Sequence, residues 1–382
     1  MASNIYLNGS TNGDISKSVV KEKESNQFKL IGKNEIHDFI IDCMTSVGTS
    51  EKHSKALADL LYTADYRGHF SHGINRLFNY VEDVSSGACN KDGEPIILNE
   101  TQSIAWIDGN NLLGPVVGLY CMSLAIEKAL NTGIGYVTCK NSNHFGIAGF
   151  YSLLASNRGL IGIVCSNTSP CNVPTRGKDI VIGSNPLSVN APGLFGDYFS
   201  LDMATSVVAF GKVEMNQMMG LDIPKGWGVD SKGEPTCKHD KILKGGAMLP
   251  LGGEEITGGY KGYGLAMMAE IMSGIVSGSD YGPHVKKWTD KSRPANLGHS
   301  FLVINPNMFA PNFEDRMSDL MDNLRNSNSL EEQHRVIVPG DLARSHMKEA
   351  DKQMGVKYHT NQISSLNSLA DKIGVNKIKC AL

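Results

Sequence analysis

Helical hydrophobic patterning at both ends of this chain encloses a long stretch of different texture. Apolar residues recur at spacings of three and four over 34–48, 50–64 and 72–86, and again over 313–326, 342–354 and 362–373. Such spacing predicts amphipathic helices. Between about residues 99 and 310, short apolar runs of strand length alternate with helical segments. We therefore predict a helical domain made of 28–98 and 311–382, with an α/β domain, 99–310, inserted into it.

The α/β stretch lacks the signatures of the common nucleotide-binding folds. GxGxxG is absent, and no Gly-Lys pair has the context of a P-loop. HExxH and GxSxG are absent as well. We predict strands at 103–107, 135–139, 160–165, 180–182, 187–190, 198–201 and 300–305. Helices are predicted at 116–130, 148–157, 204–219 and 262–277, the last of them buried.

Composition and charge argue against several classes of protein. The net charge is −3, which invites neither nucleic acid nor an anionic membrane. No apolar run reaches the roughly 18 residues that span a bilayer. Residues 1–27 are polar and lack the apolar core of a secretory signal, so we predict a disordered extension. The eight cysteines contain no CxxC pair, which predicts reduced thiols in a cytoplasmic protein and no metal site.

Two short segments place a histidine beside groups that bind anions. If a helix begins at His72, its side chain and that of Arg76 lie on one face. Histidine exchanges a proton near neutral pH, and arginine forks onto a carboxylate. Spacing alone favours a plain polar helix start there. His144 lies between a predicted strand and a predicted helix. There the spacing is equally compatible with a functional site and with a loop whose Asn and Ser side chains bond to its own backbone.

Three further turns follow apolar runs and offer hydroxyls, main-chain amides or a lysine. They are 166–170, 202–206, which is predicted to open a helix, and 259–264, which contains Lys261. Groups of this kind at a helix N-terminus suit a phosphate or a ribose. Each turn taken alone is explained more simply as helix capping.

Together these segments resemble the type 2 malate/L-lactate dehydrogenase family, from about Gln27 to the C-terminus. The resemblance is carried, in order, by SHGINRLFNY (71–80), NSNHFGIAGFY (141–151), GSNPLSVNAPG (183–193), LDMATSVVAFGKV (201–213), IPKGWGVD (223–230), LPLGG (249–253) and GYKGYGLAMMAEI (259–271). It implies a non-Rossmann fold of α/β (α+β) class. It also implies a helical domain from both termini, an inserted mixed-sheet cofactor domain, and a homodimer whose active site lies near the subunit boundary.

The resemblance further implies an NAD(P)-dependent dehydrogenase that moves hydride between its cofactor and a small 2-hydroxy or 2-keto acid, of the malate/oxaloacetate or lactate/pyruvate type. His144 is implied as the proton donor and acceptor, and His72 is the family's other candidate. Arg76 and Ser71 are implied to bind the substrate carboxylate. The implied cofactor contacts are Ser166, Asp202, Met203, Ala204, Thr205, Ser206, Lys261, Pro339, Gly340 and Asp341.

Two choices stay open at this point. The segment 210–220 has no arginine that would hold a 2′-phosphate, which favours NAD over NADP. An imine reductase for cyclic 2-imino acids would share the carboxylate and the hydride and differ in the acceptor atom. A non-catalytic binding homologue is disfavoured because His72, Arg76, His144 and Lys261 are all intact.

Overall fold

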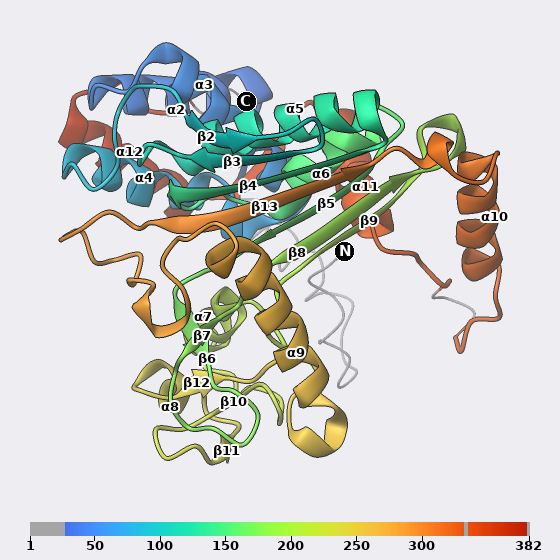
Figure 1. The fold of residues 1–382 in the computed structure, drawn as a ribbon. Helices are drawn as coiled ribbons and strands as arrows, with labels where there is room; N and C mark the ends of the chain where they lie inside the picture. Colours follow the sequence, from blue (N-terminus) through green and yellow to red (C-terminus); the bar gives the residue numbers. More distant parts are fainter. Residues whose placement is uncertain (1–26, 332–334, 380–382) are drawn as a thin grey trace.

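A seven-stranded mixed sheet forms the centre of the computed structural model, which describes residues 27–331 and 335–379 (Figure 1). Apart from Gln27, the predicted N-terminal extension lies outside the described residues. The strand order is β2-β3-β4-β13-β5-β8-β9. The bounds are β2 (Ile96–Glu100), β3 (Ile104–Asp108), β4 (Ile134–Ser142), β5 (Ile161–Ser166), β8 (Leu187–Pro192), β9 (Tyr198–Met203) and β13 (Leu297–Ile304).

Within this sheet only β3 and β4 run parallel, and the other neighbouring strands are antiparallel. A Rossmann domain is instead built on a mostly parallel sheet. The predicted non-Rossmann α/β class is therefore confirmed.

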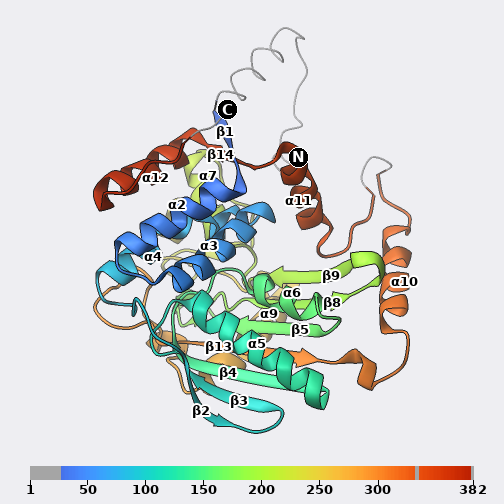
Figure 2. The same ribbon diagram turned by 90° about the horizontal axis from the view of Figure 1, so that it is seen from above.

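Helices cover both faces of the sheet (Figures 1 and 2). One face carries α5 (Gly114–Thr132) and α6 (Ala148–Ser156), and the N-terminal helices lie beyond α5. These helices are α2 (Lys33–Ser46), α3 (Glu51–Tyr66) and α4 (Leu77–Ser85). The other face carries α9 (Gly259–Glu270), which continues into a π-helical turn, Ile271–Ile275. The buried side chains of the N-terminal helices, α5, the sheet and the C-terminal helix form one continuous core.

The C-terminal segment returns to the N-terminal helices in part. Strand β14 (Val356–His359) pairs antiparallel with β1 (Phe28–Ile31). Helices α11 (Asp341–Gln353) and α12 (Thr360–Ile373) contact α3 and α2. Helix α10 (Phe313–Arg325) lies at the sheet edge against β8 and β9, and its Arg325 pairs with Asp197 in the turn before β9. The division at residues 99 and 310 stays a prediction.

A small five-stranded sheet lies below the central sheet in Figure 1. Its strands are β6 (Pro170–Asn172), β7 (Ile182–Gly183), β10 (Gly228–Val229), β11 (Pro235–Thr236) and β12 (Ala247–Met248), and it carries α7 (Phe210–Met218) and α8 (His239–Leu243). Sequence patterning predicted only β7 among these strands. Strands of two or three residues are too short to show an alternating pattern.

Three predicted helices differ from the structure. The helix predicted from residue 72 begins at Leu77, after two 3₁₀ turns, Phe70–His72 and Ile74–Arg76. The helix predicted from residue 204 begins at Phe210, because residues 205–207 bond instead to the main chain of 184 and 249–251. The predicted buried helix at 262–277 leaves Met267, Ile271 and Ile275 about half exposed in the single chain. Within the described residues, no helix combines the length and apolarity needed to cross a membrane.

Candidate functional site

The turn that carries His72 and Arg76 is held in place by a buried carboxylate. Asp65 of α3 accepts hydrogen bonds from the Ile74 amide at 2.9 Å and from the Tyr358 hydroxyl at 3.0 Å. A side chain at Gly73 would place its Cβ 1.7 Å from Asp65 Oδ1, so glycine is required at this close approach. Burial raises the pKa of Asp65 to about 7. The His72–Arg76 geometry is therefore fixed from α3 rather than by the helix that was predicted.

The guanidinium of Arg76 is tethered but has no counter-ion among the described residues. Its Nε donates to the Ser71 carbonyl at 2.6 Å. Across the described ranges, no carboxylate lies within ion-pair distance of its terminal nitrogens. The Ser71 hydroxyl lies 2.8 Å from His72 Nδ1. A guanidinium whose Nε is held in place and whose two terminal nitrogens can still donate is suited to bind a carboxylate with paired hydrogen bonds.

His144 lies in the loop between β4 and α6 and is held on several sides. Its Nδ1 lies 2.6 Å from the Tyr80 hydroxyl and accepts from the Gly146 amide at 3.3 Å. The indole of Trp288 stacks on the imidazole, with ring centroids 3.9 Å apart and planes at 14°. The Trp288 Nε1–H in turn donates to Asp83 at 2.9 Å. The imidazole thus has little freedom to rotate.

The two predicted histidines meet although 72 positions separate them in the chain. Their ring centroids lie 5.9 Å apart, with the planes at 18°. Burial, His72 and Arg76 hold the pKa of His144 well below its usual range. Burial and Arg76 lower the pKa of His72 to about 4. Near pH 7 the site therefore presents one permanent cation beside two neutral imidazoles.

Three of the predicted cofactor segments gather around residues 184–186. The Ser166 amide donates to the Pro186 carbonyl at 3.3 Å, and the Thr205 amide donates to the Ser184 carbonyl at 2.8 Å. The Thr205 carbonyl accepts from Leu251 at 2.8 Å, and the main chain of Leu251 lies against Gly262, beside Lys261. The end of β5, the end of β9 and the first turn of α9 therefore meet.

Several hydroxyls that the sequence suggested for a cofactor are used within the protein. Ser166 Oγ bonds to His299 Nδ1 at 2.8 Å and to the Gly298 carbonyl at 3.2 Å. Thr205 Oγ1 donates to the Ser184 carbonyl, and Ser206 Oγ donates to the Val208 carbonyl. The hydroxyls of Ser166, Thr205 and Ser206 are therefore engaged within the protein, as are the main-chain amides of Ser166 and Thr205. His299 Nε2 also contacts the Asn143 carbonyl at 3.2 Å, which links Ser166 to the His144 loop.

The remaining predicted cofactor residues lie on or beside β9, apart from Lys261 in α9. Asp202 accepts from the Gly149 amide of α6 at 3.0 Å, while Met203 and Ala204 are partly exposed. The Ser200 amide donates to the Pro339 carbonyl at 3.0 Å, which places the 339–341 turn two residues from Asp202. The Asp341 carboxylate pairs with Arg325 and Arg344, so its oxygens are already engaged. Lys261 is exposed, and its Nζ lies 5.8 Å from the Tyr260 ring.

Sequence reasoning missed Tyr80, Trp288 and His299. Tyr80 lies in the same motif as Arg76, four residues later, so its proximity could have been inferred. Trp288 lies in an irregular loop between α9 and β13, where no periodic signal indicates contact with His144. His299 stands between Gly298 and Ser300, one residue before the strand predicted at 300–305, so the sequence pattern gave no signal for it.

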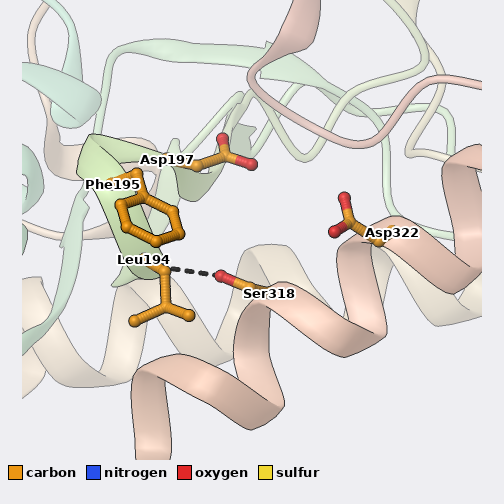
Figure 3. A pocket seen from close by; sticks show the side chains of 5 residues that line it. All are labelled: Leu194, Phe195, Asp197, Ser318 and Asp322. Carbon is orange, nitrogen blue, oxygen red and sulfur yellow. Dashed lines mark hydrogen bonds between the residues drawn. The ribbon is translucent and has the colours of Figure 1, made fainter.

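A separate cavity of ≈ 250 Å³ lies between the β8–β9 turn and α10 (Figure 3). It is lined by Leu194, Phe195, Asp197, Ser318 and Asp322. The Leu194 amide donates to Ser318 Oγ at 2.8 Å across it. None of the predicted site residues lines this cavity, and its two carboxylates would repel an anionic ligand.

Comparison with known proteins places this arrangement in context. The family model described as malate/L-lactate dehydrogenase matches residues 31–367. A malate dehydrogenase of Pyrococcus abyssi is 41% identical over 91% of this chain and 96% of its own length. A malate/(S)-sulfolactate dehydrogenase of Methanothermus fervidus is 36% identical over 91% of this chain and 98% of its own.

Solved structures agree with the fold. A malate dehydrogenase of Entamoeba histolytica superposes with a TM-score of 0.87 at 32% identity, over 92% of this chain and 99% of that one. The delta1-piperideine-2-carboxylate reductase of Pseudomonas syringae superposes with a TM-score of 0.80 at 26% identity, over 90% of this chain and 100% of that one.

Proposed function

Because the chain belongs to the malate/L-lactate dehydrogenase family, we propose that it transfers a hydride between a nicotinamide cofactor and a small 2-hydroxy acid. The observation that carries this proposal is the meeting of Arg76, which has no ion-pair partner in the described parts of the chain, with His72 and His144. Malate/oxaloacetate is the first substrate pair to test, since relatives compared above are malate dehydrogenases.

Arg76 is proposed to bind the substrate carboxylate. Its Nε is already bonded to Ser71, so the two terminal nitrogens are left to form paired hydrogen bonds with the two carboxylate oxygens. Such a contact fixes the substrate carbon relative to His144. Holding a reacting group in one orientation removes much of the entropic barrier.

His144 is proposed to move the proton. When the alcohol is oxidised, the imidazole accepts the hydroxyl proton, and in the reverse reaction it returns the proton to the carbonyl oxygen. Burial is the main cause of the lowered pKa of His144, and repulsion from His72 and Arg76 adds to it. An anionic substrate at Arg76 would offset the repulsive part and so raise that pKa. His72 is the second candidate, and its Nδ1 is already bonded to Ser71 Oγ.

The residues along β9 and α9 fit a nicotinamide dinucleotide. Met203 and Ala204, which are partly exposed, and the exposed Lys261 in the first turn of α9 are proposed to face the pyrophosphate. When bound, the cofactor would accept or give the hydride at its nicotinamide ring. We propose NAD rather than NADP, because Arg325 and Arg344 beside the 339–341 turn are both paired with carboxylates.

A homodimer in the cytoplasm is proposed as the working form. One set of exposed apolar side chains comes from β2 and β3 (Ile96, Ile97, Leu98, Ile104 and Trp106), and another from α9 and its π-helical turn (Met267, Met268, Ile271 and Ile275). Exposed apolar patches of this kind mark interaction surfaces. Sedimentation or light scattering in solution should give twice the chain mass, and a monomer would contradict the dimer.

The cytoplasmic location is proposed from the cysteines. All cysteines in the described ranges are free thiols, as is usual in a reducing compartment.

A cyclic imine reductase is the second candidate function, supported by the similarity to the piperideine-2-carboxylate reductase. The purified protein should be assayed with oxaloacetate, pyruvate and a cyclic 2-imino acid, each with NADH and with NADPH. The oxidation of the reduced nicotinamide reports turnover. A clear preference for the imino acid would select the second function, and no turnover with any substrate would contradict both.

Three variants test the proposed roles. We expect His144→Ala to lower kcat by about 10²–10⁴, the usual contribution of a general acid–base group. Arg76→Lys should mainly raise the KM of the keto acid, because a lysine ammonium cannot form the paired hydrogen bonds that a guanidinium makes with a carboxylate. His37→Ala is the matched control, since His37 pairs with Asp59 on the surface of α2. Near wild-type turnover in His144→Ala together with loss in His72→Ala would transfer the proton role to His72.

A further inference from the structure

The hydrogen bonds of His144 define which ring nitrogen carries the proton in the resting protein. The Gly146 amide approaches Nδ1 at 3.3 Å, and a backbone amide can only donate. Nδ1 is therefore an acceptor, and a neutral imidazole with an acceptor at Nδ1 has its proton on Nε2. In the described parts of the chain Nε2 has no protein partner, so it is the nitrogen available to a substrate.

This resting form is not the one that accepts a proton from an alcohol. To accept it, Nε2 must present a lone pair, so the ring proton must be on Nδ1. The charged imidazolium also carries a proton on Nδ1. In both working forms the Nδ1–H needs an acceptor, and the Gly146 amide cannot provide one.

The Tyr80 hydroxyl meets this need. It lies 2.6 Å from Nδ1, and a hydroxyl both donates and accepts. It donates to Nδ1 in the resting form and accepts from Nδ1–H in the two working forms, with no movement of the ring. A carboxylate at this position would only accept, and would raise the pKa of the histidine.

We propose that Tyr80 is a positioning residue for His144, whose hydroxyl partners Nδ1 in every protonation state and so lets Nε2 give and take the substrate proton. The proposal rests on the function proposed above. In reduction, the Nε2–H bond of the imidazolium breaks as the new O–H bond of the alcohol forms. The ring is left neutral, with its remaining proton on Nδ1 and Tyr80 as acceptor. Oxidation reverses each step.

The packing around the ring supports this role. Tyr80 is buried and meets both His144 and Trp288 edge-on, with centroids 5.8 and 5.6 Å apart. Trp288 stacks on His144 and is itself held by Asp83. These contacts leave the Tyr80 hydroxyl beside Nδ1 when the proton moves. They also favour the charged ring, since a cation is attracted to an aromatic face.

Tyr80→Phe removes the hydroxyl and keeps the ring contacts, so it tests the proposal directly. We expect kcat to fall by about 10- to 100-fold in both directions, a part of the 10²–10⁴ that acid–base catalysis contributes. The KM of oxaloacetate should change less than about twofold, because Arg76 is untouched. The imidazolium loses its acceptor, so the pH midpoint of the reduction rate should move to lower pH.

Tyr136→Phe is the matched control. Its hydroxyl donates to the Met272 carbonyl at 3.3 Å, and it contacts neither histidine. This variant should keep the wild-type kcat and pH profile. A Tyr80→Phe enzyme with wild-type kcat and an unmoved pH midpoint would overturn the proposal. If His144→Ala shows the expected loss of kcat in the same assay, that failure concerns Tyr80 alone; if His144→Ala keeps wild-type turnover, the proton role proposed for His144 fails as well.

A measurement without turnover gives a second test. Nitrogen-15 NMR of the resting wild-type protein, labelled at histidine, should show His144 protonated on Nε2 at neutral pH. A resting tautomer protonated on Nδ1 would contradict the hydrogen-bond assignment and with it the role of Tyr80.

Discussion

A methyl group at Gly114 should damage the active site from outside it. Gly114 is the first residue of α5 and packs against the main chain of the His144 loop. A Cβ at this position would lie 2.2 Å from the His144 carbonyl oxygen and 2.4 Å from that of Asn143. Real Cβ contacts are not found under 3.0 Å, so the two backbone segments must separate by roughly 0.8 Å.

The magnitudes follow from this displacement. Forcing extra volume into a packed interior costs about 1–3 kcal/mol of stability. A shift of about 1 Å in a catalytic group can cost about 10²-fold in rate. We therefore expect Gly114→Ala to lower kcat by about 10²-fold and the free energy of unfolding by about 1–3 kcal/mol. This is opposite to the usual gain of about 1 kcal/mol when glycine is replaced by alanine in a helix.

Two assays check the prediction. The first measures oxaloacetate-dependent oxidation of NADH, and the second measures urea unfolding by circular dichroism. Gly32→Ala is the control, since the nearest atom to its added Cβ is the Met354 carbonyl oxygen at 3.8 Å, in ordinary contact. The control should keep wild-type kcat and lose less than about 1 kcal/mol. Wild-type kcat and stability in Gly114→Ala would refute the argument that this contact sets the position of His144.

Two further predictions concern buried ionisable groups. Burial raises the pKa of Asp65 in the folded protein to about 7, above its ordinary value of 3.8, so its contribution to stability is present below about pH 4 and is lost as the pH rises toward 7. The free energy of unfolding of the wild type, compared with Asp65→Asn, should fall over this window by as much as about 4 kcal/mol; a constant difference would contradict the raised pKa. Burial raises the pKa of the Cys43 and Cys165 thiols to about 12, whereas Cys237 is exposed. Iodoacetamide should therefore label Cys237 first, as read by mass spectrometry, and equal labelling of Cys43 would be inconsistent with its burial.

The sequence-based predictions agree best with the structure where a long helix buries one apolar face. Helix α2 was predicted from the apolar spacing over 34–48, and the apolar side chains of that spacing, Ile36, Phe39, Ile40, Cys43 and Met44, are buried. The predicted range began at residue 34, whereas the helix begins at Lys33 with Gly32 as its cap, because the chain enters the helix from β1 and propensity alone does not fix the first turn.

Agreement fails where contacts distant in sequence replace local patterning. The segment after β9 has helical spacing from residue 204, yet Thr205 bonds to the main chain of Ser184 and Leu251, so the helix starts only at Phe210. The same holds for the turn at His72, where Gly73 and Asp65 produce two short turns instead of a helix. Local propensity is a weak prior that tertiary contacts override.

The sequence by itself determined which side chains are chemically capable of the proposed reaction, and which of the longer segments become helices and strands, because both properties depend on residue type and short-range spacing. Only the tertiary structure decided that His144 meets His72 and Trp288, and that Tyr80 faces Nδ1. It also decided that Arg76 has no carboxylate partner in the described parts of the chain, and that burial beside this cation keeps both imidazoles neutral. Charge and proton affinity depend on what surrounds a group in space, and that surrounding is assembled from residues that lie far apart in the chain.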